Sequence, residues 1–553
     1  MKNKIRLISL LLSILMLASL WGCTMPGIGT DSGEGTSENA ETTLPPEDIV
    51  IDETTWTEGV TDTPDTTEYI GPFTEPVPET VTEPELPDET TAGTSLELPY
   101  LNFGGEPVRI LYGSDAERNE FDVDISGEII DDAVFARNIK VEEKLNVKLE
   151  WKGVASNASH ANEYVQYAGN MHAAGEPYYI YAATRRAMGQ MLMNDLLLNL
   201  SSVENLFIDL SKPWYPETLN TDLSIKGTCF YITGDISANT LLQMNAIFYN
   251  KAVAERFERP GFEDLVREGK WTLDALIESS KGVYIDEDAS GTKTGGDMYG
   301  FTQSNYLDND AFYFGSGLTF FKADPTNDSF VQASFTDMAS AKADALAQKL
   351  YDFFNSPSSY VGSPITLGYD YTAPFSSGLA LFCHGTLSLA DRDGIAANLG
   401  TNYGILPIPK YDTEQERYFT TLSNKAVFWG FNRLLSSETE SMITAVAEAM
   451  AYEGYTRVSE AVFESVMKQR YHLGGESSEM YDLIRSSIRI DIGKLFAEET
   501  SALPSTFARC VTTGAGTWKI SVIPAGFRAQ VERAQKTFTK SLEHVYVFEE
   551  PQQ

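Results

Sequence analysis

Four segments between residues 107 and 183 decide the fold, and they read PVRILY (107–112), DDAVFARNIKVEEKL (131–145), VKLEW (147–151) and YYIYAA (178–183). The first, third and fourth are short and either apolar or alternating, as β-strands are. The second places Val134, Ile139 and Leu145 near helical spacing, and a further helix is expected at 161–174. Strands that alternate with helices over short connections predict βαβ units and a mostly parallel sheet, and therefore an α/β fold.

The ends of these strands indicate where a ligand binds. In open parallel sheets, ligands bind beyond the carboxyl ends of the strands. Here those ends lead into YGSD (112–115) and ATRR (183–186). We therefore expect these two turns at the mouth of a binding cleft.

The first 22 residues have the features of a secretory signal peptide. Lys2, Lys4 and Arg6 precede an apolar run over 7–20, which is shorter than the roughly 20 residues needed to cross a bilayer. The run ends in LWGC (20–23), which resembles a bacterial lipoprotein cleavage site. This resemblance implies a signal peptide over 1–22 and a lipid on the thiol of Cys23. The alternative is a plain secretory signal with a chance cysteine.

A long acidic segment follows the cysteine. Residues 24–97 are mostly Thr, Glu, Pro, Asp and Gly, contain 19 of the 79 Asp and Glu residues, and lack Lys and Arg. Few large apolar side chains are present to offset the entropy of ordering this segment, so we expect disorder. Like charges and prolines extend such a chain. Residues 23–97 are therefore predicted to be a lipidated cysteine followed by a disordered stalk.

The remainder, 98–553, has 38 Lys and Arg against 60 Asp and Glu, a formal net charge of −22. This charge argues against nucleic acid or an anionic membrane surface as a partner. The length suits two packed lobes, since single cores rarely grow beyond about 250–300 residues. Cys229, Cys383 and Cys510 show neither zinc nor redox spacing, so we expect buried free thiols.

Four further matches, in order over about 270 residues, carry a resemblance to a known family, and they lie at 137–147, 247–274, 299–302 and 375–410. They include IFYNK (247–251) followed by WTLD (271–274), and YGILPIPK (403–410). The chain resembles the family 1 extracellular solute-binding proteins, whose best-known members bind maltose and other oligosaccharides. In that pattern, the Thr at position 272 caps a helix.

The resemblance implies a two-lobed periplasmic-binding-protein-like fold of type II, with mostly parallel sheets, two or three crossing segments and a hinge cleft. Lobe one is expected at 98–236 and about 420–455, lobe two at 237–418, and C-terminal helices across both at 456–553. The implied partners are a small solute, most readily a mono- or oligosaccharide, and the permease of an ABC importer. We expect a monomer on the outer face of the cell membrane, held through its lipid alone.

Ligand contacts are expected from aromatic and polar residues placed near the hinge. Trp214 and Tyr215 follow a polar loop, although a loop-anchoring core role for Trp214 is an equal alternative. The family pattern implies contacts from Gln243, from one of Phe312, Tyr313 and Phe314, and from the HGTLSLADRD segment (384–393). That segment lacks the Trp usual in sugar binders. Further candidates are Asp391, Arg392, Trp429 and Trp518, with Asp115 and Glu117 on the first loop.

One acidic loop has the spacing of a calcium site. Asp286, Asp288, Ser290 and Asp297 occupy positions one, three, five and twelve of such a loop. However, Lys293 stands at position eight, where an apolar residue is usual, and position twelve is Asp instead of Glu. The sequence therefore favours a solvated acidic loop, and we expect neither a cofactor nor a metal.

Two other function classes compete with capture of a solute. A surface-anchored, carbohydrate-active hydrolase would use pairs of carboxylates, which are plentiful here. However, HExxH, GxSxG and Walker A patterns are absent from the sequence. A sensory or adhesive carbohydrate-binding protein would suit the long stalk. We expect a binding protein that performs no chemistry.

Overall fold

The computed structural model describes residues 95–223, 228–259, 261–305, 308–323, 331–333, 337, 340–363, 370–395, 397–470, 475–496, 503–513 and 536. Within these ranges, the side chains of residues 220, 323, 331–333, 392, 393, 503 and 513 are not described. The chain divides into two units, Met1–Leu86 and Pro87–Gln553, and every described residue belongs to the second. The predicted signal peptide, Cys23, nearly all of the stalk and Trp518 lie outside the described residues.

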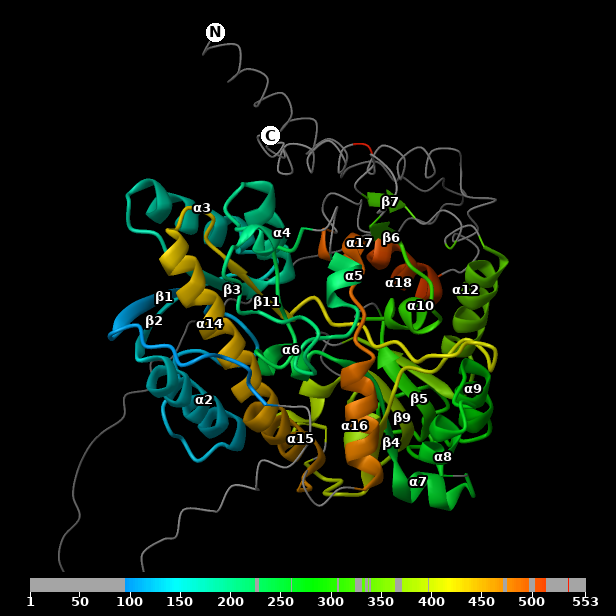
Figure 1. The fold of residues 1–553 in the computed structure, drawn as a ribbon. Helices are drawn as coiled ribbons and strands as arrows, with labels where there is room; N and C mark the ends of the chain where they lie inside the picture. Colours follow the sequence, from blue (N-terminus) through cyan, green and yellow to red (C-terminus); the bar gives the residue numbers. More distant parts are fainter. Residues whose placement is uncertain are drawn as a thin grey trace, which may run out of the picture. The chain divides into compact units, whose positions relative to one another are not determined.

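The first sheet contains the strands predicted at 107–112, 147–151 and 178–183. Its order is β11-β3-β1-β2 (Figure 1), with bounds β1 Glu106–Gly113, β2 Val147–Val154, β3 Ile180–Thr184 and β11 Val427–Phe431. β1 is parallel to both β2 and β3, whereas β11 runs antiparallel to β3. All five residues of β3 are buried, so both faces of this strand are covered. The predicted parallel sheet is confirmed.

Helices α2 (Ile129–Leu145) and α3 (Ala161–Ala173) form where the sequence predicts them. Asp131 and Asp132 lie in the first turn of α2, where negative charge suits the helix dipole. The helix ends at Asn146, whose left-handed φ of 49° stops it. α4 (Arg185–Met193) begins directly after β3, so its first turn lies at the carboxyl end of that strand.

The second sheet has five strands in the order β10-β4-β9-β5-β8. Their bounds are β4 Asn245–Asn250, β5 Tyr299–Ser304, β8 Ser359–Gly362, β9 Ala380–Thr386 and β10 Tyr403–Leu406. β5 is parallel to β8 and β9, and β4 is antiparallel to both β9 and β10. β4 is therefore the one strand of this sheet that runs against the others.

The two sheets repeat one plan. In each, three parallel strands lie side by side (β2-β1-β3 and β8-β5-β9), and an antiparallel strand follows the third. Each antiparallel strand is the first strand that the chain forms after leaving the other sheet. β4 of the second sheet follows β3 of the first, and β11 of the first sheet follows β10 of the second. The predicted α/β fold with two mostly parallel sheets is confirmed. We refer to the parts around the first and second sheets as the first and second halves.

The remaining elements of the second half surround its sheet (Figure 1). They are α7 Lys251–Arg256, α8 Phe262–Arg267, α9 Leu273–Ser280, α10 Ala311–Gly315, β6 Phe321–Ala323, β7 Val331–Ala333, α12 Ala341–Phe354, α13 Ala373–Ser376 and the 3-10 helix η2 Leu387–Asp393. The Ala275 amide donates to the hydroxyl of Thr272 at the start of α9. The predicted threonine cap is therefore confirmed.

The connection from β3 to β4 carries η1 Leu200–Ser202, α5 Leu219–Leu223 and α6 Ala238–Leu242. After β11 come α14 Ser437–Glu453, a π-turn at Gly454–Val458, α15 Ser459–Met467, α16 Glu476–Ser486, α17 Ile492–Leu495 and α18 Leu503–Thr513. α14 and α15 pack on α2 of the first half, whereas α16 packs on β10 and α18 on α12 of the second.

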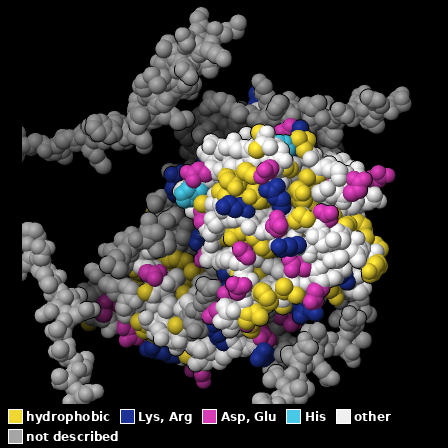
Figure 2. Space-filling model, turned by 90° about the vertical axis from the view of Figure 1, so that its left-hand side faces the viewer, with side chains coloured by type: hydrophobic (Ala, Val, Ile, Leu, Met, Phe, Trp, Pro, Cys, Tyr) yellow, Lys and Arg dark blue, Asp and Glu magenta, His cyan; other side chains and the backbone are white. Residues whose placement is uncertain are grey.

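Three smaller findings complete the fold. Among the described helices, none combines the length and the apolar character needed to cross a bilayer. Cys229, Cys383 and Cys510 are buried and form no disulfide with one another, as predicted. On the face seen in Figure 2, acidic and basic side chains are interspersed.

Candidate functional site

Two segments, at 243–245 and 420–423, connect the two halves, and a third, at 487–489, is hydrogen-bonded beside them. The Ser423 amide donates to the Gln243 carbonyl (2.9 Å), and the Asn245 amide donates to the Thr421 carbonyl (3.1 Å). The third segment joins through the Arg489 amide, which donates to the Thr420 carbonyl (2.8 Å). The segments at 243–245, 420–423 and 487–489 thus form one narrow hydrogen-bonded strip, the crossing strip.

Glu117, on the loop after β1, reaches from the first half to the crossing strip and the second half. One carboxylate oxygen accepts from Gln243 Nε2 (2.8 Å) and from Lys425 Nζ (2.8 Å). The other accepts from the hydroxyl of Ser388 in η2 (3.3 Å). Gln243 is buried, and its side chain is bound to protein in this arrangement, so its contact with a ligand stays a prediction. Glu117 is one of the two first-loop residues that the sequence indicated.

A buried network holds this loop in place. Arg137 of α2 is fully buried and donates to the carbonyls of Glu120 (2.9 Å) and Ile236 (2.8 Å). The Glu120 carboxylate accepts from the Ser237 hydroxyl (2.6 Å) and from the Asn239 amide (2.9 Å). Burial raises the pKa of Glu120 and lowers the pKa of Arg137 to about 10, and each charge partly offsets the shift of the other. The loop after β1 is thus fastened to the chain just before the crossing strip.

Asp391 lies in a second contact between the halves. Its carboxylate receives Arg118 Nη1 (2.7 Å) and the hydroxyl of Ser465 (2.8 Å). Arg118 also contacts Asp131 of α2 (2.7 Å), and only 2% of its side chain is exposed. Asp391 therefore joins η2 to α15 and to the loop after β1. Its neighbour Arg392 has no described side chain.

The carboxyl edge of the second sheet holds polar side chains that lack hydrogen-bond partners. The pairing of Thr302 with Cys383 sets Gln303 level with His384, so both side chains lie on one face of the sheet. The pairing of Ile247 with His384 places Asn245 on that same face. All three residues are buried. Among the described residues, nothing hydrogen-bonds either polar atom of Gln303, Nε2 of His384 or Oδ1 of Asn245.

The segment after β5 brings charged groups to this edge. Lys494 of α17 pairs with Asp310 (2.8 Å), and the two side chains are 6% and 8% exposed. Asn309, which directly precedes Asp310, donates to the Ser304 carbonyl, while its Oδ1 has no partner in the described chain. Burial lowers the pKa of His384 to about 3, so its ring is neutral at physiological pH. Burial also raises the pKa of Asp308, and the nearby Lys494 opposes that shift.

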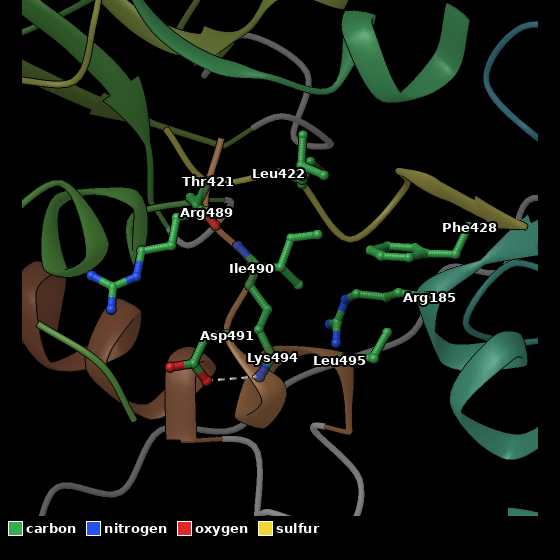
Figure 3. Close-up of a pocket in the computed structure, with 10 residues that line it drawn as sticks. Arg185, Thr421, Leu422, Phe428, Arg489, Ile490, Asp491, Lys494 and Leu495 are labelled. Carbon is green, nitrogen blue, oxygen red and sulfur yellow. Dashed lines mark hydrogen bonds between the residues drawn. The ribbon is translucent and has the colours of Figure 1, made fainter. Parts of the chain in front are cut away.

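A small pocket opens beside the crossing strip (Figure 3). It is lined by Arg185, Phe428, Leu495 and residues of the crossing strip and α17, including Thr421, Arg489, Asp491 and Lys494. About 20 Å³ is open to the centre of a water molecule, which is room for one or two waters and too little for a sugar ring. Arg185 donates to Asn424 (3.0 Å) at its edge. The predicted cleft-mouth turn at 183–186 therefore lies at this pocket.

The predicted aromatic contacts are packed against protein. Trp214 is 1% exposed and stacks edge-on against Tyr452, while Tyr215 donates to Glu448 (2.7 Å). Phe312 packs on His384, and Tyr313 stacks on Phe320. Trp429 lies in β11 against Phe121, with none of its surface exposed. In this arrangement, none of the five offers an exposed ring face, and the core role weighed for Trp214 fits its surroundings.

Sequence reasoning missed Asn245, Gln303, Asn309, Asp310 and Lys494. A signal for two of them was present, because Gln303 ends the YGFTQS strand (299–304) and Asn309 follows it. The rule that ligands bind beyond the carboxyl ends of parallel strands applies to this strand as well. Lys494 carried no such signal, since it arrives from a short helix almost 200 residues later in the chain.

No family model matches the chain, and no curated protein matches it. Solved structures do. An ABC substrate-binding protein from Listeria monocytogenes, in complex with cycloalternan, is 12% identical, with a TM-score of 0.48 over 79% of this chain and 99% of that one. The lacto-N-biose-binding protein of a Bifidobacterium longum ABC transporter is 10% identical, with a TM-score of 0.48 over 80% and 98%.

A third similar structure is a cyclo/maltodextrin-binding protein complexed with maltotetraose. It is 14% identical to this chain, with a TM-score of 0.49, and covers 81% of this chain and 99% of its own. The names of all three structures describe binding proteins.

Proposed function

We propose that this chain is an extracytoplasmic solute-binding lipoprotein. It captures a small polar nutrient, most readily a mono- or oligosaccharide, between its two halves and delivers it to an ABC import permease. It changes no covalent bond of the solute. One observation carries the proposal: buried amide and imidazole groups without hydrogen-bond partners lie at the carboxyl edge of a parallel sheet, next to the strip that joins two α/β halves.

The chemistry of this edge suits a polyhydroxylated solute. A buried polar atom without a partner costs about 1–3 kcal/mol, so native proteins rarely keep several in one place without a ligand or water to satisfy them. Gln303 offers both a donor and an acceptor, Asn309 and Asn245 offer acceptors, and Asp310 and Lys494 offer charged groups. Sugar hydroxyls are donors and acceptors at once, and therefore match such a mixed set.

Capture requires the halves to part and close again. The space beside the crossing strip holds only one or two waters, so a sugar enters when the contacts of Glu117 and Asp391 across the halves open. The hydrogen-bonded strip then acts as the hinge. A solute shifts this equilibrium only through stronger binding to the closed arrangement. A micromolar affinity needs about 8 kcal/mol, which a few satisfied buried hydrogen bonds supply together with excluded water.

The N-terminal segments place this binding unit at the cell surface. The LWGC site (20–23) supplies a lipidated Cys23, and the acidic stalk sets the folded part away from the bilayer. The fold then works as a monomer that meets permease subunits. Metabolic labelling with an alkyne fatty acid tests the anchor: the intact chain takes the label, and Cys23→Ser does not. Equal labelling of both proteins would rule out this anchor.

The binding role is tested with a thermal-shift screen of the intact chain over sugars, polyols, amino acids and polyamines. We expect a sugar to raise Tm, to be recovered unchanged by mass spectrometry, and to reduce the radius of gyration in X-ray scattering. Gln303→Leu should weaken binding of that sugar at least tenfold. Gln348→Leu, an exposed glutamine on α12, should not. Cleavage products would favour the hydrolase, and no response to any solute would contradict capture.

A further inference from the structure

We propose that the loop 286–297, which precedes β5, is a binding site for one calcium ion. Asp286, Asp288 and Asp297 each bring one carboxylate oxygen to within 4.8 Å of the other two. Oxygen ligands bind calcium at 2.3–2.6 Å, so two of them on one ion lie at most about 5 Å apart. The three carboxylates therefore fit around a single ion. This inference is independent of the proposed function.

Asp297 gives the second, independent observation. Its side chain has no exposed surface, and Oδ1 accepts no hydrogen bond from any described residue. The other oxygen, Oδ2, accepts from the Thr294 amide (3.0 Å) and lies 3.2 Å from the hydroxyl of Tyr299. An ionised carboxylate pays a large desolvation cost when one oxygen is buried unpaired, unless a cation sits against it. Oδ1 is therefore the atom that we assign to the ion.

The charges around the loop leave the three acids without a positive partner. Within the described residues, no Lys or Arg lies within 4.0 Å of the carboxylates of Asp286, Asp288 or Asp297. Asp288 accepts hydrogen bonds from the Ser290 amide (2.9 Å) and the Thr294 hydroxyl (2.5 Å), and no described cation pairs with it. Three negative groups this close repel one another unless a cation neutralises them.

The two nearby cations are engaged elsewhere. Lys293, which counted against a calcium site in the sequence, turns away from the acids and donates to the Ser356 and Ser359 carbonyls, the latter at 2.9 Å. Its ammonium therefore fastens the loop to the turn before β8. Arg256 pairs with Glu287 (3.7 Å), the acid between Asp286 and Asp288 that is not part of the cluster.

The backbone also follows the course of a calcium loop. Gly291, the sixth residue counted from Asp286, has a φ of +72°, a conformation that L side chains rarely adopt. Calcium loops have an invariant glycine at this position, where the chain turns sharply. Position seven offers the Thr292 carbonyl, and position nine the Thr294 hydroxyl. Asp at position twelve supplies a shorter side chain than Glu, so the affinity should be modest.

The site is tested on the full chain, treated with EGTA and then titrated with CaCl₂ or MgCl₂ alone. We expect one calcium per folded unit beyond any bound by the acidic stalk, a rise in Tm of about 3 °C at 1 mM CaCl₂, and a smaller rise with MgCl₂. Terbium adds a local readout, because Tyr299 contacts Asp297 and should sensitise Tb³⁺ luminescence when excited at 280 nm.

Three variants separate the loop from the stalk and from general charge effects. Asp297→Asn and the exposed Asp288→Asn should each weaken calcium binding about tenfold or more and abolish the tyrosine-sensitised terbium signal. Glu287→Gln removes a charge from the same loop and should change neither the calcium affinity nor the terbium signal. The proposal is overturned if the wild-type Tm ignores calcium, if magnesium is equally effective, or if Asp288→Asn binds calcium as well as the wild type does.

Discussion

Two buried polar clusters differ sharply in how they are satisfied. In the first half, the polar groups of Glu120, Arg137 and Asn239 hydrogen-bond to protein groups within the same network. At the edge of the second sheet, neither polar atom of the Gln303 side chain nor Nε2 of His384 has a hydrogen-bond partner among the described residues. Both clusters are almost inaccessible to solvent, so burial alone does not separate them.

The difference teaches how to separate architecture from a binding surface. A satisfied buried network holds a loop in one place, and its removal costs stability. An unsatisfied cluster costs stability while it stays empty and returns that cost when a ligand fills it. The first cluster thus positions the loop that carries Glu117 and Arg118, whereas the second keeps side-chain donors and acceptors that no described residue uses.

The largest expected effect lies in the satisfied cluster. Arg137→Met leaves the carboxylate of Glu120 buried without its charge partner and should lower the free energy of unfolding by about 3–5 kcal/mol. Lys140→Met removes a positive charge from the same helix, but at a half-exposed side chain. It should lower the free energy of unfolding by less than about 0.5 kcal/mol. Urea denaturation measures both. A loss below about 1 kcal/mol for Arg137→Met would erase the contrast between the clusters.

The second effect is a pH dependence that comes from His384. Its native pKa of about 3 lies below the unfolded value of about 6.5, so below pH 6.5 only the unfolded chain takes up the proton. Stability due to this group is therefore lost as the pH falls from about 6.5 towards 3, by about 2 kcal/mol between pH 7 and pH 5.

His384→Gln should remove this part of the pH dependence, as measured by urea denaturation at pH 7, 6 and 5. His160→Gln, a variant of a histidine whose side chain is 43% exposed, is measured alongside for comparison. An unaltered pH dependence in His384→Gln would mean that the ring is not held neutral by burial.

The third effect has the opposite sign. Gln303→Leu replaces two unpaired polar atoms by an apolar side chain of similar size and should raise the free energy of unfolding by about 1 kcal/mol. The same variant should lose affinity for the solute, which is the reverse of what a structural glutamine would do. Chemical denaturation together with calorimetry separates the two outcomes. A variant that is destabilised but keeps full affinity for the solute would show that Gln303 has a structural role.

The smallest effect belongs to the ion pair beside the crossing strip. Glu117 and Lys425 form an ion pair whose side chains are 37% and 61% exposed. Glu117→Gln should change the free energy of unfolding by less than about 0.5 kcal/mol, because water and salt screen such pairs. A double-mutant cycle with Lys425→Met in low and high salt measures the coupling. A coupling above about 1 kcal/mol would make this contact part of the framework.

The sequence predicted the strands, the helices at 131–145 and 161–174, the threonine cap and the α/β class, because those depend on local periodicity and short motifs. It could not place the ligand-facing residues. Trp214 and Trp429 are large and amphipathic, and nothing in a single sequence tells whether such a ring faces a core or a cleft. The unpaired state of Gln303 depends on which atoms surround it after folding, among them a lysine from α17.

The acidic loop 286–297 is a second case in which the sequence alone does not give the surroundings of a side chain. The spacing fitted a calcium loop, but the sequence favoured a solvated loop, since Lys293 occupied a position that an apolar residue usually holds and position twelve was Asp instead of Glu. Only the folded arrangement reveals that the lysine turns away and that Asp297 is buried. Whether the residues of a motif can bind an ion therefore depends on where each side chain points, and the sequence alone does not give that direction.

The exchange of strands between the sheets has a consequence for biosynthesis. Until β11 emerges, β3 has an uncovered edge, and β11 begins about 240 residues after β3 ends. At 5–20 residues per second, a ribosome needs roughly 12–50 s to produce that stretch. An open strand edge invites pairing with other chains for all of that time. The edge of β3 therefore has to stay unpaired with other chains until β11 is made, and neither half can be excised as an autonomous folding unit by a single cut.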